Sequence, residues 1–222
     1  MTGSGRHGQR GSSVLRRSAL VVALVLTAVA AVAAVVAVVA FDGRGSSRSV
    51  PVVGDSITFF AGTDISAALA GAYHAHTYGE IGARIDEVLP TLQGAIRSSP
   101  FAVVVNLGTN DALQAQTHPD WRSGFDRMIA VLGPKRCVLL TTISTLLPGP
   151  SAVQEVASAI NDGIATTVRA HANMHVVDWN AAVHGPAGAG LLVPDRIHPS
   201  AAGQLTLAGL VRRAVDANCR AT

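Results

Sequence analysis

Three side chains of this 222-residue chain are of the types that turn a hydroxyl group into a nucleophile. Ser56 lies in Gly-Asp-Ser-Ile at 54–57, and Asp195 and His198 lie in Asp-Arg-Ile-His-Pro at 195–199. A serine hydroxyl attacks a carbonyl efficiently only when a base removes its proton, and histidine is the usual base. A carboxylate that orients the imidazole completes the arrangement. The residue types therefore predict catalysis with Ser56 as nucleophile, His198 as general base and Asp195 as its partner.

A carbonyl oxygen that becomes negatively charged during such an attack needs hydrogen-bond donors aimed at it. The candidate donors are the backbone N–H of Ser56, the side chain of Asn110 and a backbone N–H in Gly-Glu-Ile-Gly-Ala at 79–83. In that last segment we expect Gly82 to be the donor, with Gly79 as the alternative. A residue without a Cβ lets its backbone come close to a ligand.

Each of these motifs follows an apolar run that is typical of a buried strand. Strands are expected at 49–53, 73–78, 101–107, 136–143 and 174–179, and helices at 65–72, 85–96, 121–132, 153–170 and 201–215. Strands rich in Val and Leu that alternate with helices predict a five-stranded parallel sheet of the flavodoxin-like, doubly wound α/β type. The carboxyl ends of parallel strands share one edge, where such folds bind ligands. Motifs about 140 residues apart are therefore expected to share one cleft.

Together the motifs resemble those of the SGNH, or GDSL-like, hydrolases. Four blocks carry the resemblance in order: GDSI at 54–57, a Gly-rich turn at 79–83, GTND at 108–111 and DRIHPSAAG at 195–203. The resemblance spans about residues 50 to 217 and implies the SGNH hydrolase fold for a catalytic domain at 50–222. It also implies the roles given above for Ser56, Gly82, Asn110, Asp195 and His198, a structural role for Asp55, and no metal or organic cofactor. Ile57 and Ile81 stand where many relatives have Leu and Ser.

The N-terminal part of the chain has a different composition. Residues 18–41 form 24 consecutive residues without a charge. As a helix they would be about 36 Å long, enough for a hydrocarbon core of about 30 Å. We expect a transmembrane anchor, and a cleaved signal peptide remains the alternative. Four arginines in residues 1–17 predict a cytoplasmic tail, so the linker at 42–49 and the domain would lie outside the cell membrane, or be secreted after cleavage.

Charge and cysteine content exclude other classes of protein. Residues 42–222 carry 13 basic against 14 acidic residues, or −1, which speaks against a nucleic-acid partner. His74 and His76 lack an evident third ligand, so no metal site is expected. Cys137 and Cys219 should lie at the sheet edge opposite the motifs, where a disulfide and two free thiols both remain open.

The expected function is that of an extracytoplasmic, membrane-anchored serine esterase acting on short-chain or O-acetyl esters. One alternative is an O-acyltransferase of cell-envelope glycans or glycolipids, and another is a non-catalytic wall-binding module. The substrate would be a small ester or an acylated glycan or lipid. The expected rim loops show no aromatic or charged cluster that nominates a ligand: 57–64, 112–120, 144–150 and 180–194. The sequence does not indicate an oligomeric state.

Overall fold

The computed structural model describes residues 48–133 and 136–220. Outside these ranges lie the expected tail at 1–17, the expected anchor at 18–41 and residues 42–47 of the linker. Within them, no helix combines the length and the apolar character needed to cross a lipid bilayer.

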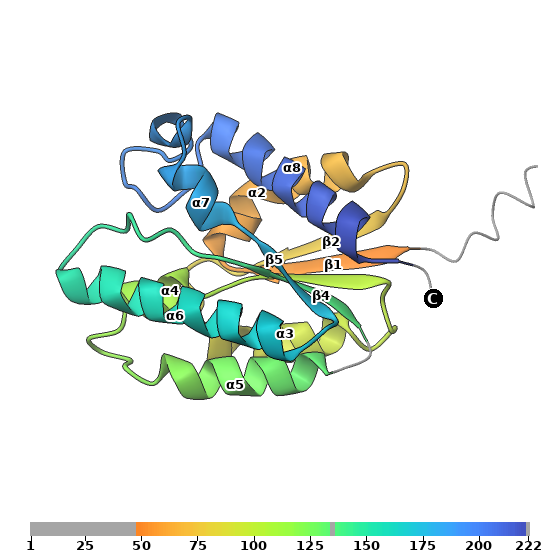
Figure 1. Ribbon diagram of the computed structural model, residues 1–222, viewed down its shortest axis with the longest axis horizontal. Coiled ribbons are helices and arrows are strands. Elements are labelled where there is room, and N and C mark those ends of the chain that lie inside the picture. The colour runs from red at the N-terminus through yellow and green to blue at the C-terminus, as the bar shows by residue number, and fades with distance from the viewer. Residues whose placement is uncertain (1–47, 134–135, 221–222) are drawn as a thin grey trace, which may run out of the picture. The chain divides into compact units, whose positions relative to one another are not determined.

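Five parallel strands form one sheet in the order β2-β1-β3-β4-β5 (Figure 1). The strands are β1 (Ser49–Gly54), β2 (His74–Gly79), β3 (Ala102–Asn106), β4 (Cys137–Thr141) and β5 (Met174–Val177). This order is that of flavodoxin-like folds, so the predicted α/β architecture is confirmed.

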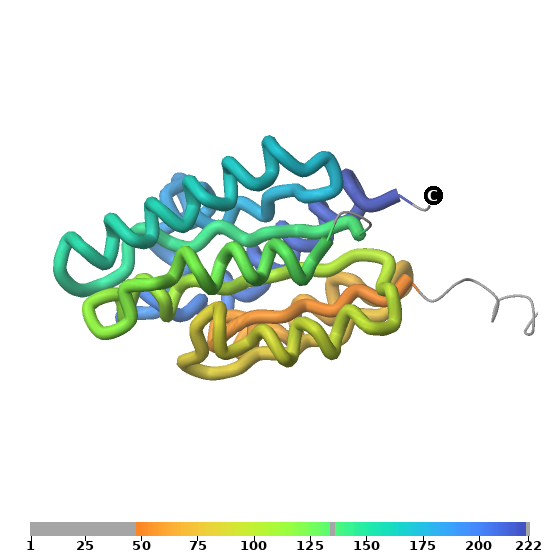
Figure 2. The backbone as a smooth tube through the Cα atoms, turned by 90° about the horizontal axis from the view of Figure 1, so that it is seen from below, coloured from red at the N-terminus to blue at the C-terminus, as the bar shows by residue number. Residues whose placement is uncertain are grey.

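Helices cover both faces of the sheet. One layer holds α2 (Ser56–Leu69), α7 (Trp179–His184) and α8 (Ala201–Asn218), with a 3-10 turn at Gly188–Gly190. The other holds α3 (Ile85–Ala95), α4 (Thr109–Leu113), α5 (Trp121–Leu132) and α6 (Ser151–Ala170). Figure 2 shows α3, α5 and α6 running beside one another in this second layer. Alternate β3 residues enter the two cores, with Val103 and Val105 in one and Ala102 and Val104 in the other, as the pleat of a strand requires.

The carboxyl ends of three strands finish in one row. Gly54 of β1 lies opposite Gly79 of β2 on one side and Asn106 of β3 on the other. The motifs that follow these strands therefore begin at the same level, as expected for a shared edge.

A disulfide lies at the opposite edge of the sheet, where the strands begin. Cys137 at the start of β4 is bonded to Cys219 at the end of α8, with 5.6 Å between their Cα atoms. Of the two states that the sequence left open, the structure has the bridged one. It ties α8 to β4, the neighbour of the edge strand β5.

Candidate active site

Ser56 lies at a sharp turn from strand to helix. β1 ends at Gly54 and α2 begins at Ser56, so Asp55 is the only residue between them. Asp55 caps the helix, because its Oδ1 accepts a hydrogen bond of 2.9 Å from the Ile57 N–H. A Cβ on Gly54 would collide with Thr58 Oγ1 and with the Asn106 carbonyl, so only glycine fits there. The Ser56 N–H belongs to the first turn of the helix and has no acceptor within it.

The three side chains expected to act together form one hydrogen-bonded chain. His198 Nε2 lies 3.0 Å from Ser56 Oγ, and His198 Nδ1 lies 2.7 Å from Asp195 Oδ2. Desolvation raises the pKa of Asp195, but hydrogen bonds from the His198 ring and from the His198 and Ile197 N–H groups outweigh it and hold this pKa below its usual value. Asp195 is therefore an ionised partner that fixes the orientation of the imidazole.

The turn that carries Asp195 and His198 is fastened to a distant loop by Arg196. Its Nε and Nη2 donate to the Leu146 carbonyl at 2.8 and 2.6 Å, and Nη2 also donates to the Leu147 carbonyl at 3.2 Å. Arg196 has a φ of 60°, in the left-handed region that disfavours residues with a Cβ. The guanidinium contacts hold this unfavourable conformation in place. Sequence reasoning did not single out Arg196.

Two of the candidate oxyanion donors, Gly82 and Asn110, follow β2 and β3 and are linked through Ala83. Gly108 has a φ of 117° and is the N-cap residue of α4, in which Asn110 is buried. Asn110 Nδ2 donates to the Ala83 carbonyl at 3.0 Å, which leaves its second N–H for another acceptor. Gly82 stands beside Ala83 with a φ of 78°, in a turn closed by the Ala83 N–H donating to the Glu80 carbonyl. A Cβ on Gly82 would meet no atom within 4 Å, so space does not demand a glycine here. The positive φ does.

The alternative donor, Gly79, is required for packing. It ends β2, and a Cβ there would collide with the backbone of Phe59. Gly79 therefore lets α2 lie close to β2.

Two carboxyl groups are buried beneath this edge. Asp55 is fully buried, and its desolvation, reinforced by the charge of Asp111, raises its pKa to about 7 against the opposing hydrogen bond from Ile57. Desolvation is also the main reason that the pKa of Asp111 rises to about 6, although Asp111 Oδ2 accepts from the Ile85 N–H at 3.0 Å. Within the described part of the chain, Asp55 Oδ2 has no hydrogen-bond partner.

An aromatic pair begins beside the histidine, contrary to the expected absence of an aromatic cluster at the rim: Phe60 lies against His198, and Phe59 lies against Phe60. Phe60 is 44% exposed, and its ring centroid lies 5.1 Å from that of His198, edge to face. Phe59 is 55% exposed, with its ring centroid 5.4 Å from that of Phe60. The available signal was their position three and four residues after Ser56, because on a helix such residues lie on the same face as Ser56.

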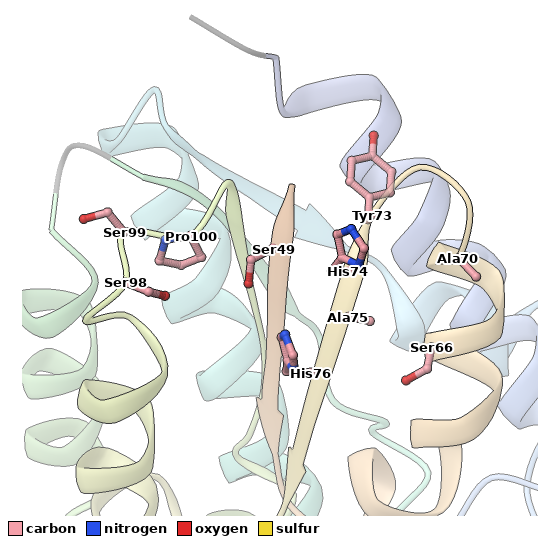
Figure 3. A pocket seen from close by; sticks show the side chains of 10 residues that line it. All are labelled: Ser49, Ser66, Ala70, Tyr73, His74, Ala75, His76, Ser98, Ser99 and Pro100. Carbon is pink, nitrogen blue, oxygen red and sulfur yellow. The ribbon is translucent and has the colours of Figure 1, made fainter. Parts of the chain in front are cut away.

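A pocket of about 600 Å³ lies away from these residues, around the start of β1 and β2 (Figure 3). Ser49, His74, His76 and residues 98–100 line it, and none of the predicted site residues does. Across the described ranges, no group of three or more His, Cys, Asp or Glu side chains is placed to hold a metal ion. His74 and His76 lie on the edge strand β2.

Comparison with solved structures finds similar folds among bacterial hydrolases and transferases. A lipase/acylhydrolase from Enterococcus faecalis is 21% identical with a TM-score of 0.63, and the match covers 79% of this chain and 99% of that one. The catalytic domain of a Streptococcus pneumoniae peptidoglycan O-acetyltransferase is 18% identical with a TM-score of 0.62, over 78% and 94% of the two chains. A family 3 carbohydrate esterase from Clostridium thermocellum is 16% identical with a TM-score of 0.60, over 77% and 96%. At these identities the likeness concerns the fold.

Comparison with curated proteins finds no match. The model of the GDSL-like lipase/acylhydrolase family matches residues 52–205, which is more than half of the chain and includes every candidate site residue. The chain therefore belongs to the GDSL-like lipase/acylhydrolase family, the SGNH hydrolases that its motifs resemble.

Proposed function

We propose that the protein is a serine esterase that hydrolyses carboxylic esters through an acyl-enzyme on Ser56. The observation that carries this proposal is the continuous chain of hydrogen bonds from Asp195 through His198 to Ser56 Oγ. Membership of an acylhydrolase family supports the same class of reaction.

In the first step, Ser56 Oγ attacks the ester carbonyl carbon and its proton passes to His198 Nε2. The imidazolium that forms is stabilised by ionised Asp195. The negative charge on the carbonyl oxygen is met by the N–H groups of Ser56 and Gly82 and by the free N–H of the Asn110 amide. Collapse of this intermediate breaks the bond to the alcohol oxygen, which takes the proton from His198 and leaves the acyl group on Ser56.

In the second step, His198 removes a proton from a water molecule that attacks the acyl-enzyme. The bond to Ser56 Oγ breaks, the proton returns to this oxygen, and the carboxylic acid leaves. The charge-free residues 18–41 support placing this activity outside the membrane, anchored there, or secreted after cleavage.

Acyl transfer is the second candidate, because the same acyl-enzyme can be attacked by a sugar hydroxyl instead of water. The likeness to the catalytic domain of a peptidoglycan O-acetyltransferase supports it. Incubation with p-nitrophenyl acetate and a soluble glycan, followed by mass spectrometry of the glycan, separates the two. Acetate without acetylated glycan indicates hydrolysis. The intact hydrogen-bonded chain argues against a non-catalytic binding module.

The test of the proposed function is replacement of the nucleophile. Ser56→Ala should lower the turnover of p-nitrophenyl acetate and butyrate by at least about 10⁴-fold, as removal of a serine nucleophile does elsewhere. Ser66→Ala, on the same helix but at the distant pocket, is the matched control and should keep full activity. A fluorophosphonate probe should label the parent protein and not Ser56→Ala. Activity that survives in Ser56→Ala would disprove the assignment.

A further inference from the structure

A second hollow adjoins the aromatic pair beside His198. This groove of about 530 Å³ lies at the free edge of β2 and is bounded by α2, the end of β2 and α3. Phe59 contributes to its wall, so the rings of Phe60 and Phe59 form a continuous path from His198 into the groove.

The groove combines aromatic surface with hydrogen-bonding groups. Its aromatic residues are Phe59 and Tyr78, which are 55% and 40% exposed. Its polar side chains are Thr63, Thr77, Glu80 and Thr91. Thr91 and Glu80 bond to each other, but an alkyl chain in this groove would still remove the Thr63 hydroxyl and the second oxygen of the Glu80 carboxylate from water without a new partner, which is unfavourable. A sugar ring presents C–H groups on its faces and hydroxyls around its edge, so it matches both kinds of surface.

Two glycines allow α2 and β2, which form walls of the groove, to lie close together. A Cβ on Gly79 would collide with the Phe59 backbone, and a Cβ on Gly62 would lie 3.0 Å from Thr77 Oγ1. The Thr91 hydroxyl donates to the Glu80 carboxylate, which joins α3 to the segment after β2. The groove is therefore built by packing contacts of the described residues themselves.

The position of the path beside His198 identifies which part of an ester would follow it. The histidine gives its proton to the leaving alcohol, so the alcohol oxygen must come within hydrogen-bonding reach of Nε2. The alcohol part of the substrate therefore starts next to Phe60, and any extension of it passes Phe59. We infer that the alcohol is a sugar residue of an acylated oligosaccharide, whose neighbouring residues occupy the groove lined by Phe59, Tyr78 and Glu80.

This inference rests on the proposed esterase function, and the full chain can test the two separately. The substrates are acetylated xylo- and chito-oligosaccharides of one to four sugars, with p-nitrophenyl acetate and hexyl acetate as esters without a sugar. For at least one glycan series, kcat/KM should rise tenfold or more from one sugar to three. In Phe59→Ala this gain, measured relative to the single-sugar ester in the same variant, should fall below threefold.

Two further variants separate the groove from general effects of surface substitution. Phe59→Leu keeps apolar volume but loses the flat ring, and it should also lose most of the gain. Leu205→Ala removes another exposed apolar side chain, from α8, that does not line the groove, and it should keep the gain. Thermal unfolding of each variant checks that it is folded.

The inference is overturned if kcat/KM does not rise with sugar number in either glycan series, or if Phe59→Ala keeps the rise. It is also overturned if kcat/KM for hexyl acetate is as high as for the three-sugar esters and falls as far in Phe59→Ala. The groove would then hold an alkyl chain. In each case turnover of p-nitrophenyl acetate that depends on Ser56 would leave the esterase function standing. Turnover independent of Ser56 would remove that function instead.

Discussion

Replacing Asp55 by Asn should make the protein more stable at alkaline pH and leave the helix cap beneath Ser56 in place. The Asn side chain keeps a carbonyl oxygen that can accept from the Ile57 N–H, as Asp55 Oδ1 does now. It cannot ionise, so the cost of a buried charge disappears. The substitution therefore separates the capping role of Asp55 from its titration.

The size of the effect follows from the pKa of Asp55, which burial raises from 3.8 to about 7. Three pKa units correspond to about 4 kcal/mol. Because the folded-state pKa lies above the unfolded one, the stability of the neutral form is complete below about pH 4 and is lost as the pH rises through about 7. The stability of Asp55→Asn relative to the parent should thus grow by about 1.4 kcal/mol per pH unit between these values and then level off.

Urea unfolding at pH 4, 5.5, 7 and 8.5 measures this difference directly. Asp64→Asn, which removes a less buried carboxylate from the same helix, controls for the change in net charge. A difference between Asp55→Asn and the parent that stays constant over this range would refute the reasoning, because it would mean that burial does not perturb Asp55. A constant offset from the new amide N–H groups does not affect the slope.

Two other sets of changes test how the site is supported, one at the disulfide and one at Arg196. Reduction of the disulfide, or Cys137→Ser with Cys219→Ser, should cost about 4 kcal/mol of unfolding free energy for a separation of 82 residues, with unchanged kcat in the folded protein; equal urea midpoints for the two forms would contradict this. Arg196→Ala and Arg196→Gly should each lower kcat/KM by about tenfold through misplacement of His198. The Gly variant should be the more stable by about 1 kcal/mol, because only glycine relieves the positive φ. Parent-like kinetics in both variants would show that Arg196 does not position the turn.

The positions of Ser56 and Asn110 could be predicted because each comes directly after an apolar run whose end is recognisable, whereas α7 and a 3-10 turn separate β5 from Asp195 and His198. Gly54 and Gly108 mark the ends of such runs, and parallel strands bring their ends to one edge. The prediction needed no knowledge of side-chain contacts. It depended on topology, which alternating strands and helices determine.

The first half of α2 could not be predicted in the same way. A helix was expected only from residue 65, whereas α2 begins at Ser56. Ile57, Thr58, Phe59 and Phe60 are β-branched or aromatic, and such residues have modest helix propensity. Burial of Ile57 and Thr58 and the cap at Asp55 outweigh this preference. The two phenylalanines were consequently assigned to a loop, and their place beside His198 was missed.

Other features depend on contacts that no local pattern reveals. Arg196 reaches carbonyl groups about 50 residues away, and its charge and neighbours give no sign of this. The burial of Asp55 and Asp111 is equally hidden, because carboxylates at the start of helices are usually solvated caps. The small α4 is too short for hydrophobic periodicity to indicate it.

Because Gly54, Gly79 and Asn106 lie in one row, the lengths of β1, β2 and β3 cannot change independently without moving the motifs that follow them. One extra residue inside any of these strands would advance its end by about 3.3 Å and reverse the side chains beyond it. The three motifs would then start at different heights. Insertions should be tolerated where they leave the row intact, at the exposed turn residues 70–72 and 97–99 on the far side. Engineering of new loops or fused domains should begin there.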